Sequence, residues 1–429
     1  MPEPTTPRLG VCHGPDGAAN LREIYVASQG VCEVVLLVRA AVAAANPDIM
    51  RVAERFFECH VLSGGHVLPG DGALPGDHVA EIVAPLGLRG VTTFHDDELE
   101  LADALHPATA APTHNPWDKL VQRRVLGEHG LTSVDAVPVD APEDLVRGFA
   151  TLGRPCVLKP RRAAGGQGIA FIDADWDVRR QLDLRRDWTG LMLETRIDPA
   201  PHPTGPPWLG SLVSVETVST GAERVHLGVL DKLPVAVTRG AGPGGADAVH
   251  VQGDLLPSGL SPERSRAARQ YTGEILDALK VGPRVTHTEL LLTPEGFDVL
   301  EVNGRLAGHT SRLFRLLRGP DLVRIALQVA VGDMPEVGPP IAPGAAAGVF
   351  PTFARRRGPV RTSLRRRMLR EIPGVCAVDE LAQDGADKSA TQYRIANLTL
   401  RGDDRAALDA SVGEVLRTLS EGFAEGGDG

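Results

Sequence analysis

Two short segments of the 429-residue chain carry side chains that could together hold a metal ion. Glu289 lies twelve residues before Glu301, and Asn303 follows two residues later. The runs Thr288–Leu292 and Phe297–Val302 read as strands, and the four residues between them favour a turn, so a hairpin is expected. This hairpin places Glu289 beside Glu301, with Asn303 on the same face. Two carboxylates and an amide oxygen are ligands that Mg²⁺ prefers.

Arg305 continues the same alternation by two more residues and would point the same way. A guanidinium there could bind a carboxylate or a phosphoryl group through two hydrogen bonds. Together these residues predict a magnesium-nucleotide site. The simpler alternative is that the acidic side chains are solvated or paired with a basic neighbour, which could be Arg305 itself. Phosphate-binding elements earlier in the chain would favour the first interpretation.

Such elements do precede the acidic residues. Lys159 ends an apolar run and is followed within a few residues by Gly165, Gly166 and Gly168. Glycines let backbone N–H groups approach phosphate oxygens, and a lysine neutralises their charge. The order differs from a P-loop because the lysine precedes the glycines. Farther along, the apolar strand ending at Glu194 runs into polar residues, and its carboxylate could accept a hydrogen bond from the amino group of adenine.

Composition limits the classes of protein that fit. The length suits about three domains, and a hydrophobic content of 42% is ordinary for a globular protein. A formal net charge of -10 argues against nucleic acid or an anionic membrane as a partner. No apolar run approaches the roughly 20 residues of a membrane span, and residues 1–10 do not resemble a secretion signal. The five cysteines are scattered and form no CxxC pair, which is typical of a reduced, cytoplasmic protein.

The order of expected elements gives the fold class, which is mixed α/β and α+β. Residues 8–112 alternate strands and helices, which indicates a parallel, Rossmann-like sheet; the turn at His13–Gly17 lacks the GxGxxG spacing of a dinucleotide site. Strands are expected at 9–13, 33–38, 59–62, 90–94, 191–194, 212–219 and 224–230, and a strand, loop and strand at 155–172. Helices are expected at 19–28, 47–57, 79–86, 97–105, 117–130, 176–186, 262–279 and 405–419.

Two segments rich in proline, alanine and glycine or threonine divide the chain. Residues 107–116 read as a connector, and residues 338–348, after a helical pair ending near Gly332, read as a domain boundary. We therefore expect an N-terminal domain over 1–112, a central domain over 113–337 with a lid subdomain at about 150–200, and a small C-terminal αβ domain over 338–429. The tail at 421–429 is expected to be disordered.

Taken in order, these segments resemble the ATP-grasp superfamily over about residues 8–420. The shared motifs are Asp118-Lys119, Leu158-Lys159-Pro160 with Gly165–Gly168, Leu193–Ile197, Ser214-Val215-Glu216, Leu230-Asp231-Lys232, His287-Thr288-Glu289 and Glu301–Gly308. The resemblance implies an ATP-grasp fold with a Rossmann-like pre-ATP-grasp domain and a C-terminal domain like that of biotin carboxylase.

The resemblance also implies a role for each matched residue. ATP and two Mg²⁺ ions, with Mn²⁺ as a substitute, are the implied cofactors. The implied metal ligands are Glu289, Glu301 and Asn303. Arg305, Lys159 and Lys232 are the implied catalytic residues, with Arg305 stabilising the phosphoryl group in transfer. Nucleotide binding is implied for Lys119, Lys159, Gly165, Gly166, Gly168, Glu194, Thr195, Ile197 and Glu216.

Three activities are compatible with the resemblance. The Glu301-x-x-x-Arg305-Leu306-Ala307-Gly308 run is most similar to L-amino acid (dipeptide) ligases, which activate a carboxylate as an acyl phosphate and couple it to an amine, releasing ADP and phosphate. A carboxylase of the biotin carboxylase type, acting on a small substrate, is the alternative. An ATP-binding regulatory module is the third, and the full set of metal ligands with Arg305 disfavours it.

Other features are open to two interpretations. Arg355–Arg370 contains eight arginines and could recruit RNA or a phosphorylated substrate, but a solvated face or a subunit contact fits the acidic balance of the chain better. His309 either contacts substrate or only starts a helix. The substrates are expected to be a small carboxylate and an amine, selected by loops such as Arg239–His250 and Thr310–Leu317. Dimers are common in the resembling families, so a homodimer is an expectation.

Overall fold

The computed structural model describes most of the chain. The described residues are 6–15, 17–62, 76–106, 116–153, 155–163, 165–221, 223–240, 242–335, 337, 344–351, 360–386 and 394–423. Several expectations therefore lie wholly or partly outside the described residues. They are the connector at 107–116, the boundary at 338–348, the first part of the arginine run, the end of the C-terminal tail, and single residues of the loops at 155–172 and 239–250.

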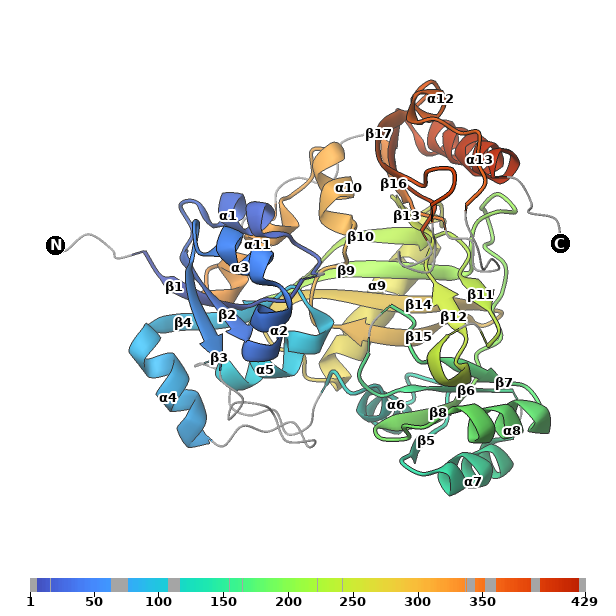
Figure 1. Cartoon of the computed structure of the whole chain (residues 1–429), viewed down its shortest axis with the longest axis horizontal. Helices are drawn as coiled ribbons and strands as arrows, with labels where there is room; N and C mark the ends of the chain where they lie inside the picture. The colour runs from blue at the N-terminus through green and yellow to red at the C-terminus, as the bar shows by residue number, and fades with distance from the viewer. Residues whose placement is uncertain are drawn as a thin grey trace.

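The N-terminal part is a parallel four-stranded sheet with helices around it (Figure 1). Its strand order is β3-β2-β1-β4. The central strands are almost wholly apolar, as expected for a parallel sheet covered on both faces. The predicted Rossmann-like sheet is confirmed, with strands β1 (Arg8–Cys12), β2 (Glu33–Arg39), β3 (Glu58–Leu62) and β4 (Leu88–Thr93). The helices are α1 (Leu21–Ser28), α2 (Ala40–Ala45), α3 (Pro47–Ala53), α4 (Gly76–Leu86), η2 (Asp96–Glu98) and α5 (Leu99–Leu105).

A second, smaller unit is an antiparallel sheet with strand order β5-β8-β6-β7, flanked by helices (green in Figure 1). The strand, loop and strand expected over residues 155–172 are its β6 and β7. The sequence did not indicate β5 or α7, which begin before residue 150. We call this unit the lid, and it contains β5 (Ala136–Val139), α7 (Pro142–Leu152), β6 (Cys156–Pro160), β7 (Ala170–Ile172), α8 (Asp175–Leu184) and β8 (Leu191–Thr195).

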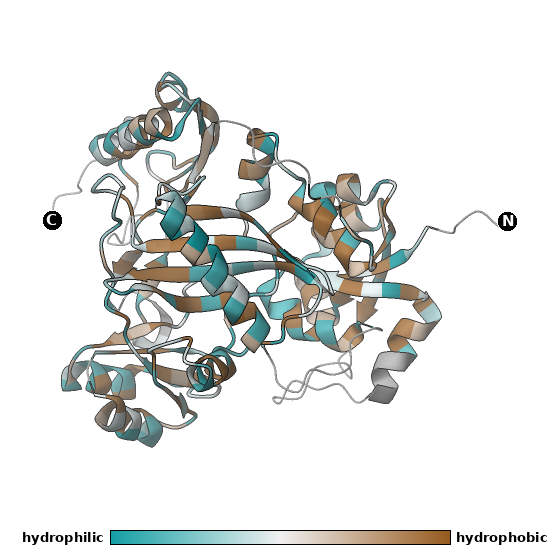
Figure 2. Ribbon diagram, turned by 180° about the vertical axis from the view of Figure 1, so that it is seen from behind, coloured by the Kyte–Doolittle hydropathy of each residue, from teal (hydrophilic) through white to brown (hydrophobic). Residues whose placement is uncertain are grey.

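The largest sheet has eight strands in the order β15-β14-β9-β10-β13-β16-β18-β17. Helix α9 (Pro262–Ala278) crosses one face of it and turns its polar side outward (Figure 2). The strands of this sheet are β9 (Leu212–Ser219), β10 (Arg224–Lys232), β13 (Gly253–Leu256), β14 (Arg284–Thr293), β15 (Gly296–Asn303), β16 (Ala345–Val349), β17 (Val375–Leu381) and β18 (Ala396–Gly402).

The C-terminal segment continues the large sheet. Residues 344–351 were expected only as the end of a linker and the start of the following unit, yet Ala345–Val349 forms the fully buried strand β16 between β13 and β18. Small side chains there let α10 and α13 pack closely on the strand. The remaining helices are α6 (Lys119–Glu128), α10 (Thr310–Leu316), α11 (Leu322–Ala330), α12 (Arg366–Arg370) and α13 (Arg405–Gly422).

Helix α11 fastens the N-terminal unit to the large sheet. It contacts α1, β4 and β14, and seven of its nine residues are buried. Its apolar side chains belong to one continuous core with Leu36 of β2 and Val285 of β14. The loops that follow β1 and β4 are therefore held against the large sheet. Among the described residues, no helix is long and apolar enough to cross a membrane.

Candidate nucleotide and metal site

The acidic hairpin forms as predicted, with strands a few residues longer than expected. Glu289 pairs with Glu301 across β14 and β15, and His287 pairs with Asn303. The register shifts just after Glu289, where a bulge increases the twist of the strand. The carboxylates of Glu289 and Glu301 are 14% and 21% exposed, so both remain reachable by an ion.

Helix α6 holds the hairpin by its outer edge. β15 is the last strand of the large sheet, and its free backbone groups need partners. Gln122 supplies them by donating to the carbonyl of Val302 (2.8 Å) and accepting from its N–H (3.1 Å). Arg123 donates to the carbonyls of Val299 (2.5 Å) and Leu300 (2.9 Å). Lys119, one turn earlier on α6, is thereby held above Glu301.

Lys119 and Asn303 stabilise the ionised form of Glu301. Lys119 Nζ lies 3.2 Å from Glu301 Oε2, and Asn303 Nδ2 donates to Oε1 at 3.0 Å. Burial alone would raise the pKa of Glu301, but Lys119 and Asn303 lower it to about 2. Lys119 also donates to the carbonyl of Ala163 (2.7 Å), which joins the glycine-rich loop to the acidic hairpin.

The oxygen ligands on this hairpin fit a hard divalent cation. Glu289, Glu301 and Asn303 offer two carboxylates and an amide oxygen from paired strands, and an ion that also bound phosphates would complete its shell from them. Among the described residues, no group of three His, Cys, Asp or Glu side chains is arranged to hold a metal alone. Three oxygen ligands leave positions in an octahedral shell for phosphate oxygens, so the set suits Mg²⁺ that arrives with a nucleotide.

His287 and Glu216 support the carboxylate of Glu289, one of the candidate metal ligands. His287 Nε2 is 3.0 Å from Glu289 Oε1, and its Nδ1 makes a short contact with Glu216 of β9. Burial would lower the pKa of His287, but Glu216 and Glu289 raise it to about 9. The imidazolium therefore fixes the orientation of Glu289. Glu216 is fully buried behind it, a supporting position that the sequence did not indicate.

Lys232 forms a buried ion pair on the other side of Glu289. Its Nζ lies 2.5 Å from Asp254 of β13 and 4.0 Å from Glu289. Burial would lower the pKa of Lys232, but Asp254 and Glu289 raise it. Lys232 is thus a fixed positive charge beside the hairpin. Asp254 was missed in the sequence, where it lies in an otherwise apolar strand without a recognisable motif.

Lys159 and Glu194 face each other in the lid sheet, next to the hairpin. Lys159 Nζ is 2.6 Å from Glu194 Oε1, and Arg123 Nε donates to Oε2 at 2.8 Å. Burial would raise the pKa of Glu194, but the two cations lower it to about 2. Both carboxylate oxygens are thus already engaged, and binding of an adenine amino group would have to share or replace one of these contacts. Burial lowers the pKa of Lys159.

Arg123 is a central residue of the site that the sequence did not indicate. Replacing Arg123 with Met should lower the free energy of unfolding by about 3 kcal/mol, because Glu194 and two carbonyls lose a buried partner. Denaturant unfolding followed by circular dichroism measures this change. Arg124→Met, on the exposed side of the same helix, is the matched control and should stay within about 0.5 kcal/mol of the wild type. Equal stabilities of the two variants would contradict the assigned role.

Arg305 connects the site to the N-terminal unit. Its guanidinium makes a short ion pair with Asp96, which begins η2 just after β4. Burial would lower the pKa of Arg305, but Asp96, Glu301 and Glu289 raise it. Asp96 was missed in the sequence because its partner is 209 residues away. The carboxyl end of a parallel strand is nevertheless where such loops commonly carry function.

The glycine-rich loop has backbone angles that glycine adopts readily. Gly165, Gly166 and Gly168 have φ of 66°, 73° and 70°. A Cβ on Gly166 would lie 2.5 Å from the carbonyl oxygen of Val249, so this position also requires a residue without a side chain. The loop, which joins β6 to β7 in the lid, thus lies against the short strand β12 (Ala248–His250).

The remaining predicted residues lie at the edges of the site. Thr195 ends β8, and its backbone N–H donates to the carbonyl of Asp135 (2.9 Å); Ile197 follows two residues later. His309 stacks on Phe350 with a centroid distance of 4.4 Å, and burial lowers its pKa. The described part of the arginine run includes α12, far along the sheet from the hairpin in Figure 1.

This chain has the ATP-grasp fold, as the sequence predicted, and proteins of known structure share it over nearly their whole length. An L-amino acid ligase from Bacillus licheniformis aligns with a TM-score of 0.66 and 17% identity, covering 97% of this chain and 98% of that chain. N5-carboxyaminoimidazole ribonucleotide synthetase from Thermus thermophilus aligns with a TM-score of 0.60 and 18% identity, covering 98% and 100%. The biotin carboxylase domain of Hydrogenobacter thermophilus 2-oxoglutarate carboxylase, solved with MgADP and bicarbonate, aligns with a TM-score of 0.60 and 15% identity, covering 99% and 91%.

Sequence comparison finds one curated relative, which matches part of the chain. Human carnosine synthase 1 is 26% identical over an alignment of 279 residues, and the match covers 60% of this chain and 33% of that protein. The chain thus spans about a third of the length of this relative. No protein-family model matches the chain.

Proposed function

We propose that this protein is an ATP-dependent carboxylate–amine ligase. It phosphorylates the carboxylate of a small substrate, an amino acid, and an amine then displaces phosphate to form an amide. The observation that carries the proposal is the register of Glu289 with Glu301, with Lys119 above the pair and Arg305 beside it. The likeness to an L-amino acid ligase and to carnosine synthase 1 supports the same reaction class.

In the proposed reaction the chain binds the nucleotide from two sides. Lys119, Lys159 and the loop at Gly165–Gly168 would hold the phosphates, and the β8 end from Glu194 to Ile197 would hold adenine. Glu289, Glu301 and Asn303 would hold two Mg²⁺ ions, which offset the negative charge of the triphosphate. The ammonium group of Lys159 is paired with Glu194 in the structure. To bind a phosphate, this ammonium group would have to leave Glu194.

The positively charged residues then stabilise the transferred group. The carboxylate oxygen attacks the γ-phosphorus, the bond to ADP breaks, and Arg305 stabilises the charge of the acyl phosphate that forms. Lys232, a fixed buried cation next to Glu289, is the second group available for this role. Glu216 acts on Glu289 through His287, which lies between the two carboxylates. The amine nitrogen then attacks the acyl carbon, phosphate leaves, and the amine releases a proton.

We infer further properties of the protein from the same features. The chain divides at about residues 112 and 337 into three domains, with the lid inside the second. Its partners are small molecules and not nucleic acid, given the net charge of -10, and a second copy forms a homodimer. The protein is cytoplasmic, which agrees with five cysteines that are all free.

The experiment that tests the function is a phosphate-release screen with ATP and Mg²⁺. Amino acids are supplied singly and in pairs, and a ligase should release phosphate only with a matching pair that also yields a new amide by mass spectrometry. Phosphate release by no pair would contradict the proposal.

A carboxylase is the second candidate because the fold aligns over 99% of this chain with a biotin carboxylase domain solved with bicarbonate. Bicarbonate with each amine is therefore run in parallel. Bicarbonate-dependent phosphate release without a new amide would favour this candidate over the ligase.

A further inference from the structure

A hairpin arm rises from the large sheet between two strands of the site and reaches the lid. The arm comprises residues 233–240 and 242–253, with β11 (Ala236–Thr238) paired to β12 (Ala248–His250). Its base is fixed, because Leu233 N–H donates to the carbonyl of Gly253 at 2.9 Å. Lys232 and Asp254, the buried ion pair next to Glu289, flank this base directly.

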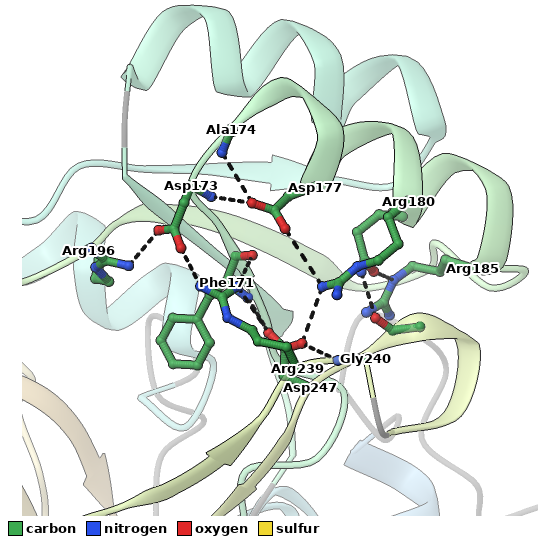
Figure 3. A network of polar contacts seen from close by, with 12 residues as sticks. Phe171, Asp173, Ala174, Asp177, Arg180, Arg185, Arg196, Arg239, Gly240 and Asp247 are labelled. Carbon is green, nitrogen blue, oxygen red and sulfur yellow. Dashed lines mark hydrogen bonds and ion pairs between the residues drawn. The ribbon is translucent and has the colours of Figure 1, made fainter. Parts of the chain in front are cut away.

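The tip of the arm is fastened to the lid by Asp247, whose side chain is 0% exposed (Figure 3). Its carboxylate accepts from the backbone N–H of Phe171 in β7 (2.8 Å) and from that of Gly240 in the arm (2.7 Å). Its own N–H donates to the carbonyl of Ile169 at 2.7 Å. One buried residue therefore bonds the backbones of both elements.

Two arginines complete this contact, one from each side. Arg180 of α8 donates to Asp247 at 3.2 Å, and Arg239 of the arm lies 3.4 Å from the same carboxylate. Arg239 also donates to the carbonyl of Phe171 at 2.6 Å and pairs with Asp173 (Figure 3). We call Asp247, Arg180 and Arg239 the clasp.

The clasp determines where the glycine-rich loop lies. Gly166 approaches the backbone of Val249 in β12 more closely than any side chain would allow. Gly168 directly precedes Ile169, whose carbonyl accepts the hydrogen bond from the N–H of Asp247. The loop that would cover the phosphates is therefore held at one end of the arm, while Lys232 and Asp254 lie at the other end.

We propose that Asp247 is a positioning residue that joins the lid to the arm, so that the phosphate loop and the Lys232–Asp254 pair are set in place together. This inference rests on the proposed ligase function. In this inference the arm couples closure over ATP to the position of Lys232 beside Glu289, where the acyl phosphate would form. Water would then be kept from the acyl phosphate only when the clasp is closed.

The structural test is amide hydrogen exchange of three variants, with and without Mg²⁺ and the β,γ-imido analogue of ATP. In Asp247→Asn, exchange at Phe171 and Gly240 should become about 10-fold faster or more, because both amides lose a charged acceptor. Arg239→Ala, at a half-exposed position, should also accelerate exchange at these two amides. This variant replaces Asp247→Asn in the test if Asp247→Asn folds poorly. Asp183→Asn makes the same charge change at an exposed position of α8 and should match the wild type.

The kinetic test uses the same variants with the substrate pair found for the wild type. Asp247→Asn should raise the KM for ATP and for the amine together by about 10-fold and release phosphate without amide, while Asp183→Asn stays coupled. Wild-type exchange rates and full coupling in both Asp247→Asn and Arg239→Ala would overturn the inference. An inactive wild type with accelerated exchange in these variants would instead overturn the ligase function and leave the clasp intact.

Discussion

Replacing Glu301 with Gln is expected to lower amine-dependent turnover by about 100-fold or more, although the protein should still fold. Glutamine keeps the shape of the side chain but removes the negative charge that Lys119 and Asn303 stabilise on Glu301. A loss of this size, about 2.7 kcal/mol, is typical for removal of one preorganised electrostatic group. Initial rates of phosphate release at saturating Mg²⁺ measure it.

Glu295→Gln is the matched control for this prediction. Glu295 is exposed in the turn of the same hairpin, so the same chemical change there should leave turnover within about twofold of the wild type. Thermal unfolding of both variants separates a lost metal ligand from a damaged fold. Near-normal turnover of Glu301→Gln would contradict the assignment of the metal site.

Replacing Arg305 with Ala should abolish coupled amide formation, with a loss of about 1,000-fold, and change ATP binding far less. Arg305 is buried beside Glu289 and Glu301, where an acyl phosphate would form, whereas Lys159 and the β8 end would still bind the nucleotide. Turnover with the matched substrate pair and nucleotide affinity by calorimetry are the two measurements.

Two further variants define what Arg305 does. Arg264→Ala, at an exposed position of α9, should behave as the wild type in both measurements. Asp96→Asn removes the ion-pair partner of Arg305 but keeps the arginine, so it should retain more turnover than Arg305→Ala. Equal losses of nucleotide affinity and turnover in Arg305→Ala would mean that the residue serves binding alone.

The local sequence pattern was sufficient to predict elements that are built from segments close together in the sequence. The hairpin of Glu289 and Glu301 follows from alternation and a short turn, and its register is found as expected. The parallel N-terminal sheet follows from the order of apolar runs and helices. The strand, glycine-rich loop and strand expected over residues 155–172 are also found, and the structure adds that Gly165, Gly166 and Gly168 have left-handed backbone angles.

Elements defined by tertiary burial were missed for physical reasons. β16 consists of three alanines, one glycine and one valine, so only its last residue is of the β-branched or aromatic kind that marks a strand, and its place inside the sheet stabilises it. β5 contains Pro138, which usually argues against a strand, but β5 lies at a sheet edge where proline is tolerated.

The partners of the site residues could not be predicted because they are distant in sequence. Arg123 stands next to the exposed Arg124 in an amphipathic helix, and nothing local shows that it reaches Glu194, 71 residues later. Asp247 lies in a glycine-rich loop of the kind usually left to solvent, and its burial depends on the lid. Sequence patterns therefore predicted candidate ligand-binding residues, but they did not indicate the side chains that hold those candidates in position.

The most direct test of the proposed reaction follows one oxygen atom from the substrate carboxylate. The acyl donor is labelled with ¹⁸O at both carboxylate oxygens and incubated with ATP, Mg²⁺ and the matched amine, and the products are analysed by ³¹P NMR and mass spectrometry. If the carboxylate attacks the γ-phosphorus and the amine then displaces phosphate, the released phosphate carries one ¹⁸O, with ADP and the amide formed in equal amounts. Unlabelled phosphate, or AMP and pyrophosphate as products, would contradict an acyl phosphate ligase.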